Sequence, residues 1–160
     1  MASRHLSNRE NWQAHANVVG SKGETGFASA LAECLPSKYS VELKPPKLKV
    51  YPQGRGVILD CRVVNKETGK CLYIEKKTGN KGGNAHERVY KFLSPGLKRL
   101  VQSKYNTVSN PFYMVFSGET FQGEKYQNEF ELLLEGENYA VMDRNFGNIE
   151  EVAKDIMEIV

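Results

Sequence analysis

Two carboxylates and a lysine in the middle of the chain, Asp60, Glu75 and Lys77, have side chains suited to the chemistry of a bound cation. Hard divalent cations prefer carboxylate oxygens and keep some of their waters. A lysine beside such an ion could orient a water molecule or help to deprotonate it. A different interpretation is a hairpin surface held by salt bridges, in which Glu75 and Lys77 are simply hydrated. The spacing alone leaves both interpretations open.

Two short apolar runs, Val57–Val64 and Cys71–Lys77, carry these residues and are predicted to form the strands of a hairpin. Side chains alternate between the two faces of a strand. Asp60, Glu75 and Lys77 are therefore predicted to converge on one face, where each charge must be paired or hydrated. The opposite face is predicted to be an apolar core of Leu59, Cys61, Val63, Leu72 and Ile74.

A glycine-rich segment, Lys81–Arg88, follows the second run and leads into a helical pattern. Its G-N-A-H-E-R sequence, beside the spacing of Asp60, Glu75 and Lys77, resembles the EcoRI/MunI-like type II restriction endonucleases of the PD-(D/E)xK superfamily, and MunI more closely than EcoRI. Shorter matches to the same family lie at Asn11–Ala14, Pro95–Leu97 and Pro111–Gly118. The resemblance extends over nearly the whole chain.

The resemblance implies a Mg²⁺-dependent endonuclease that cleaves double-stranded DNA at a short specific site. Asp60 and Glu75 would hold the ion, with the backbone carbonyl of Lys76 as a third ligand, and Lys77 would position the attacking water. A carboxylate-held Mg²⁺ neutralises charge at the scissile phosphate, assists the leaving oxygen and lowers the pKa of a bound water. A glutamate on the first core helix supports the site in similar nucleases; Glu24 is the candidate, although its charge also suits a helix N-terminus.

The resemblance also implies that Gly83–Arg88 reads DNA, because the matching segment of EcoRI and MunI reads the central A·T pairs of the site. An A·T-rich centre such as AATT is therefore expected. Asparagine can pair bidentately with adenine, and arginine with guanine. In a structural interpretation, the asparagine caps the following helix and the arginine pairs with a carboxylate, and both interpretations can hold together. The residues implied in recognition are Gly83, Asn84, Ala85, Glu87 and Arg88.

Two positions depart from the family pattern. Leu59 stands where a proline usually precedes the first aspartate. Gly82 stands where MunI-like sequences have an arginine that reads the outer base pair. We therefore expect another residue to read that pair, or the pair itself to differ.

Length and composition predict a single domain over residues 1–160, of which 40% are hydrophobic and 26% charged. The net charge is only +3, but basic residues outnumber acidic ones between Lys66 and Lys104, whereas the part from Glu119 is rich in acids. A basic middle fits a surface that faces a polyanion. Candidates for phosphate contacts, or for a solvated helix face, are Lys91, Lys98, Arg99 and Lys104.

The three cysteines, Cys34, Cys61 and Cys71, lack metal-ligand spacing, and the last two are predicted to lie on opposite faces of the hairpin. Their odd number and the lack of a secretory signal predict a cytoplasmic protein. No apolar run approaches the length needed to span a bilayer.

The elements that must position the site follow from the periodicity of the apolar residues. Helices are predicted over Glu24–Leu35, Asn84–Ser103 with a break near Pro95, and Ile149–Val160. Further strands are predicted over Tyr39–Leu43, Phe112–Phe116 and Tyr139–Met142, whereas Tyr126–Leu134 fits a helix or a strand. This alternation predicts an α/β fold in which helices flank a mixed central sheet, the restriction-endonuclease-like core that the resemblance implies.

A palindromic double-strand cut is most simply made by two identical active sites related by a two-fold axis. The chain carries one D…ExK pattern, so a homodimer on DNA is expected; a heterodimer with a second nuclease chain, or a monomer that nicks the strands in turn, stays open. The sequence is also compatible with a small catalytic or nicking subunit of a heteromeric restriction enzyme and with a DNA-binding module on the same fold. The presence of Asp60, Glu75 and Lys77 together argues against the binding-only module.

Overall fold

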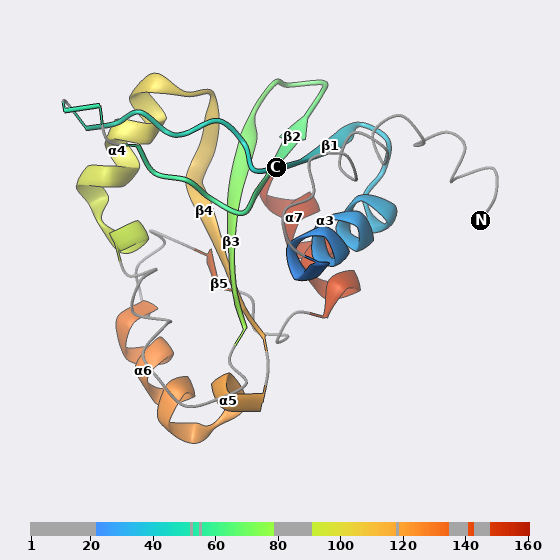
Figure 1. Cartoon of the computed structure of the whole chain (residues 1–160), viewed down its shortest axis with the longest axis vertical. Coiled ribbons are helices and arrows are strands. Elements are labelled where there is room, and N and C mark those ends of the chain that lie inside the picture. The colour runs from blue at the N-terminus through green and yellow to red at the C-terminus, as the bar shows by residue number, and fades with distance from the viewer. Residues whose placement is uncertain are drawn as a thin grey trace.

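A mixed sheet forms the centre of the molecule (Figure 1). The computed structural model describes residues 22–51, 53–54, 56–78, 91–117, 119–134, 141–142 and 148–160. The strands of these parts, in sheet order, are β1 (Tyr39–Leu43), β2 (Cys61–Asn65), β3 (Cys71–Thr78), β4 (Thr107–Ser117) and β5 (Val141–Met142). The helices are α3 (Lys22–Cys34), α4 (Pro95–Lys104), α5 (Glu119–Gln122), α6 (Glu124–Leu134) and α7 (Ile149–Ile159).

The sheet contains both kinds of pairing. β1, β2 and β3 pair antiparallel, whereas β3, β4 and β5 pair parallel. Parallel neighbours need a crossover connection, and α4 lies within the connection from β3 to β4. The predicted α/β fold with a mixed central sheet is therefore confirmed.

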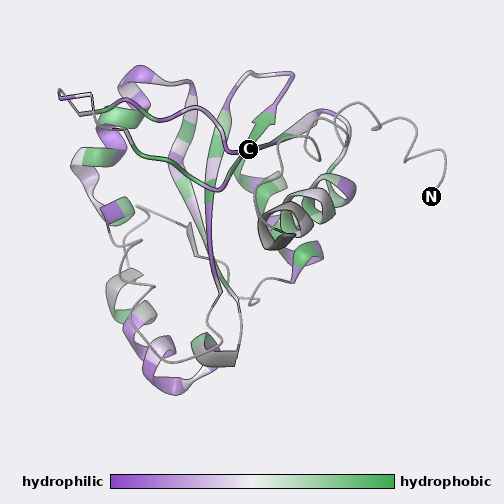
Figure 2. Ribbon diagram, viewed as in Figure 1, coloured by the Kyte–Doolittle hydropathy of each residue, from purple (hydrophilic) through white to green (hydrophobic). Residues whose placement is uncertain are grey.

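Helices cover both faces of the sheet, and β4 is buried on both sides from Pro111 to Phe116. α3 and α7 pack against each other and on one face, where Leu31 and Ile156 are buried with Val63 and Val115. α4 covers the other face, where Leu97 and Val101 join a separate cluster. In Figure 2, α4 and α7 each carry both hydrophobic and hydrophilic residues, as expected of helices with one buried side.

The predicted hairpin forms, but its first strand is shorter than Val57–Val64, because β2 begins at Cys61. Val57 instead makes an isolated bridge with Leu48. The residues from Val57 to Asp60 therefore do not continue the alternation of the strand. The break leaves Asp60 immediately before β2.

Leu59 was predicted to share a core with Cys61, and this prediction is wrong. Leu59 is buried with Tyr73 in the cluster under α4, whereas Cys61 is buried under α3 and α7. The cause is the break before β2, because alternation holds only within a continuous strand. The other predicted members, Val63, Leu72 and Ile74, do lie with Cys61. Cys71 lies in the opposite cluster from Cys61, as predicted.

Where the structure describes them, the remaining elements follow the predictions closely. The strand Tyr39–Leu43 is confirmed, and the ambiguous Tyr126–Leu134 segment belongs to a helix, α6. The break predicted near Pro95 is also present, because Ser94 caps α4 by accepting a hydrogen bond from the Leu97 N–H at 3.3 Å. Proline fits the first turn of a helix, where its missing N–H is not needed.

Candidate active site

Strand pairing places Asp60 next to Glu75. Cys61 is the register partner of Ile74, and the Asp60 N–H donates to the Ile74 carbonyl at 3.2 Å. The Asp60 carboxylate is itself held in place, because Oδ2 accepts a hydrogen bond from the backbone N–H of Lys76 at 2.7 Å. The side chain of the first candidate residue is thus fixed against the strand that carries the second.

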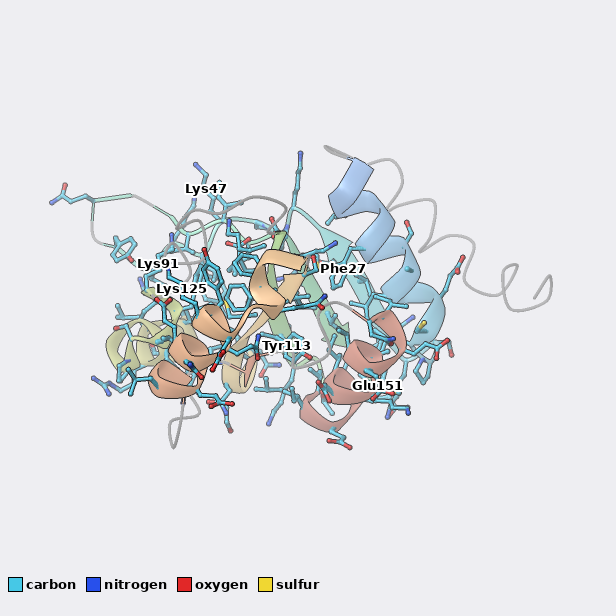
Figure 3. The ribbon with its side chains drawn as sticks, turned by 90° about the horizontal axis from the view of Figure 1, so that it is seen from below. Phe27, Lys47, Lys91, Tyr113, Lys125 and Glu151 are labelled. Carbon is cyan, nitrogen blue, oxygen red and sulfur yellow. The ribbon has the colours of Figure 1, made fainter. Side chains whose placement is uncertain are left out.

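Alternation along β3 separates Lys76 from its neighbours in sequence. The Lys76 ammonium lies 5.1 Å from the centre of the ring of Phe27, a residue of α3 that is labelled in Figure 3. Glu75 and Lys77, whose register partners in β4 are Met114 and Phe116, project from the opposite side, towards the cluster under α4. The candidate residues therefore share one face, as predicted.

Two acidic groups meet at this point. The pKa of the Glu75 carboxyl is raised to about 8, first by burial and then by a hydrogen bond with Asp60 and by the negative charge of that residue. The positive charges of Lys77 and Lys91 act in the opposite direction. The structure therefore brings Asp60, Glu75 and Lys77 together. Burial and the neighbouring Asp60 raise the pKa of Glu75 by more than the two lysines lower it.

Lys91 is the member of this group that the sequence pattern did not indicate. It was a candidate for contacting phosphate, but its charge also acts on Glu75. The connection runs through packing: Phe92, the next residue, lies 4.8 Å from Phe112, measured between ring centres, and Phe112 is the register partner of Tyr73. Contacts of this kind between distant segments leave no local signal in the sequence.

A second acidic residue of the sheet, Glu42, has a different neighbour. Glu42 and Arg62 are register partners in β1 and β2, and the Arg62 Nε donates to Glu42 Oε2 at 2.8 Å. Burial lowers the pKa of Arg62, but its hydrogen bonds to Tyr73 and Glu42, together with its charge interactions with the same two residues, outweigh burial and raise the pKa overall. Burial raises the pKa of Tyr73 to about 12. The Glu42–Arg62 pair is therefore a neutral structural link between two strands.

The donor set at the candidate site suits a hard cation rather than a soft one. In the described ranges no group of three or more His, Cys, Asp or Glu side chains could hold a metal ion. The available protein ligands are thus the two carboxylates of Asp60 and Glu75 and backbone carbonyls such as that of Lys76. A hard divalent cation completes such a partial set with waters or substrate oxygens.

Of the other candidate residues, only some lie among the residues that the structure describes. The recognition residues Gly83, Asn84, Ala85, Glu87 and Arg88 lie outside the described residues. Glu24 lies in α3, which matches the helix predicted over Glu24–Leu35. Among the helices that the structure describes, none has the length and apolar character to cross a membrane.

Comparisons with known proteins agree on one family. Residues 50–155 match the family model described as "Type II restriction enzyme MunI". The type II restriction enzyme MunI of Mycoplasma sp is 29% identical over an alignment of 169 residues, which covers 81% of this chain and 82% of the relative.

The fold agrees as well. The crystal structure of MunI restriction endonuclease in complex with cognate DNA superimposes with a TM-score of 0.63 at 23% sequence identity, and the match covers 92% of this chain and 94% of that one. Because the family model spans more than half of the residues, the likeness is one of family as well as fold. The chain belongs to the MunI family of type II restriction enzymes, which are site-specific deoxyribonucleases.

Proposed function

We propose that the chain is a Mg²⁺-dependent type II restriction endonuclease that hydrolyses both strands of DNA at a short specific site. The observation that carries this proposal is the pairing of Asp60 with Glu75 beside Lys77. Placing two acids in contact is costly unless a cation or a proton balances them. A requirement for a divalent metal ion also accords with membership of this class of enzymes.

Each residue has a distinct part in the proposed reaction. Asp60 and Glu75 would hold the ion through their carboxylate oxygens, with the Lys76 carbonyl as a third ligand. When bound, Mg²⁺ would neutralise charge on the scissile phosphate and lower the pKa of a water. The Lys76 N–H keeps the Asp60 carboxylate oriented. Lys77 would position the attacking water and would place a positive charge beside the scissile phosphate.

Sequence recognition is assigned to Gly83–Arg88 by its likeness to the EcoRI and MunI segment. The site is proposed to have an A·T-rich centre, and Gly82 in place of an arginine is proposed to change how the outer pair is read. Lys91 follows this segment by three residues, and its charge acts on Glu75.

The proposed assembly is a homodimer of single-domain chains, residues 1–160, acting in the cytoplasm. One chain supplies one cleavage centre, and two centres related by a two-fold axis match a palindromic site. Light scattering with and without a cognate duplex tests this assembly. A monomer bound one-to-one to the duplex, producing nicked circles before linear DNA, would exclude the homodimer, whereas a partner chain required for activity would indicate a heterodimer.

The activity itself is tested by digesting plasmid DNA with the purified chain and Mg²⁺, followed by sequencing of the ends. Discrete fragments whose sites share an A·T-rich centre are expected. A site with a G·C centre would overturn the assignment of the recognition segment. Intact plasmid over a panel of sequences, with protein shown to be folded, would overturn the proposed activity.

A further inference from the structure

A hollow of 410 Å³ opens beside Asp60, and two lysines line it. Lys44 and Lys47 are both exposed, so their ammonium groups can reach a ligand. The lining residues are Lys44, Pro45, Lys47, Ile58, Leu59 and Asp60. The charged groups around the hollow are thus two cations and the proposed cleavage carboxylate.

The backbone at Lys44 is fixed relative to Asp60. The Lys44 N–H donates to the Asp60 carbonyl at 3.0 Å. Lys44 also has a φ of 45°, in the left-handed region that residues other than glycine seldom adopt. Two prolines, Pro45 and Pro46, follow it and restrict the chain further. Such a backbone holds the first lysine at a set distance from the acid.

The backbone around Lys47 is fixed from the other side. The Tyr105 hydroxyl accepts from the Lys49 N–H at 2.7 Å, and the Lys104 ammonium donates to the Lys49 carbonyl at 3.2 Å. Gly56 lets the segment approach closely, because a Cβ at that position would lie 2.8 Å from the Cβ of Lys47. The end of α4 and the residues before β2 thus hold the backbone around the second lysine, Lys47, which is labelled in Figure 3.

We propose that Lys44 and Lys47 bind DNA backbone phosphates next to the scissile phosphate. This inference rests on the proposed function, in which Asp60 marks the position of the scissile phosphate. Lysine binds phosphate as a point charge. Contacts of this type set the register and orientation of the duplex and carry no sequence information. Lys44 and Lys47 are therefore positioning residues that keep the cleaved strand against Asp60.

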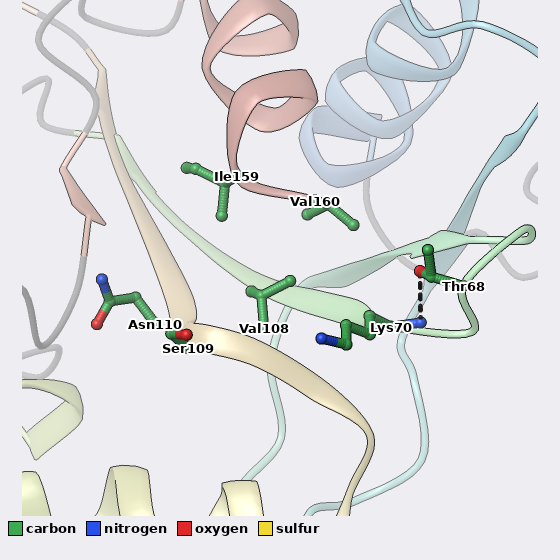
Figure 4. Close-up of a pocket in the computed structure, with 7 residues that line it drawn as sticks. All are labelled: Thr68, Lys70, Val108, Ser109, Asn110, Ile159 and Val160. Carbon is green, nitrogen blue, oxygen red and sulfur yellow. Dashed lines mark hydrogen bonds between the residues drawn. The ribbon is translucent and has the colours of Figure 1, made fainter.

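The chain offers a matched control in Lys70, which lines a second hollow of 470 Å³ together with Thr68, Val108, Ser109, Asn110, Ile159 and Val160 (Figure 4). Lys70 precedes Glu75 by five residues, so it lies roughly 17 Å from the cleavage centre along the strand direction. Replacing it removes the same charge from a hollow of similar size at the other end of β3.

The test measures affinity for a short DNA duplex, without divalent metal, over a range of salt concentrations. Lys44→Ala and Lys47→Ala should each reduce the slope of log K against log salt by about one, since each removes one phosphate contact. The Lys47→Arg variant should keep the slope. Lys70→Ala should also keep it. Circular dichroism establishes that every variant is folded.

A second arm places the contact on the DNA. Single methylphosphonate substitutions remove the charge of one phosphate at a time along the cleaved strand. Wild-type protein should lose affinity when the phosphates flanking the cut are substituted, and the Lys44→Ala/Lys47→Ala double variant should show little further loss there.

The results separate the inference from the function on which it rests. A double variant with the wild-type salt slope, in a protein that cleaves, would overturn the inference. The inference would also be overturned if methylphosphonate substitution beside the cut reduced the affinity of the double variant as much as that of the wild type. Wild-type protein that shows the lysine-dependent slope but never cleaves would overturn only the proposed function.

Discussion

Two pairs of side chains on neighbouring strands show how differently this sheet treats its acids. Glu42 in β1 accepts from the Arg62 guanidinium in β2, so positive and negative charge cancel. Asp60, immediately before β2, instead meets Glu75 in β3, so two acids share one site. The first pair is accounted for as a structural link. The Asp60–Glu75 pair, in contrast, destabilises the fold when no cation is bound. Unfavourable arrangements of this kind are concentrated at functional sites.

The largest effect should come from removing either acid of the Asp60–Glu75 pair. Asp60→Ala or Glu75→Ala should lower the cleavage rate at least about 10³-fold, because a catalytic metal ion supplies several kcal/mol of transition-state stabilisation. Specific DNA binding should be largely retained. In the same cleavage assay the matched control, Glu42→Ala, should cleave at a rate near that of the wild type. Equal losses in all three variants would show that the Asp60–Glu75 pair is no more important for cleavage than the Glu42–Arg62 pair.

Lys77→Ala should also abolish most cleavage, by about 10²-fold or more, since it removes the group that positions the attacking water. Unlike loss of an acid, this change should leave metal binding in place. Single-turnover cleavage and metal titration of the same variant separate the two effects. Near-normal cleavage by this variant would remove Lys77 from the assignment.

The meeting of the two acids was predictable from the sequence, whereas much of their surroundings was not. Alternation within β3 is a local property, and it placed Glu75 and Lys77 on one face. Asp60 lies before β2, and the hydrogen bond from its N–H to the Ile74 carbonyl brings it to the same place. Leu59 was misplaced because the break before β2 depends on the bridge between Leu48 and Val57. The charge of Lys91 on Glu75, likewise, depends on packing between segments that are distant in sequence.

A smaller effect concerns the pH dependence of stability in metal-free protein. The pKa of Glu75 is about 8 in the folded chain against an ordinary 4.5, so the folded state binds this proton more tightly. The stabilisation that results from this tighter proton binding by Glu75 is fully present below pH 4.5 and is lost as the pH rises through 8. The loss should be of the order of 2 kcal/mol after allowance for partial exposure.

Glu75→Gln mimics the protonated acid and should therefore remove this part of the pH dependence. Urea unfolding at several pH values between about 4 and 9 provides the measurement. The variant should match the wild type at the acidic end of this range and exceed it in stability at the basic end. Parallel curves for the two proteins would show that the acids do not oppose each other in the folded state.

The smallest effect should come from breaking the oppositely charged pair. Glu42→Gln should lower the free energy of unfolding by about 0.5–1 kcal/mol, since the two side chains are 38% and 23% exposed and partly screened by water. Cleavage should change little. Urea unfolding at neutral pH measures the loss, and a cleavage defect larger than the stability defect would tie this pair to the active site.

The central claim, that Asp60 and Glu75 form a site for a divalent cation, is tested most directly by the effect of Mg²⁺ on thermal unfolding without DNA. An ion that binds only the folded chain raises the unfolding temperature with concentration. The wild type and Glu42→Gln should show this rise, and Glu75→Gln should show little or none. An equal rise in wild type and Glu75→Gln would contradict the claim.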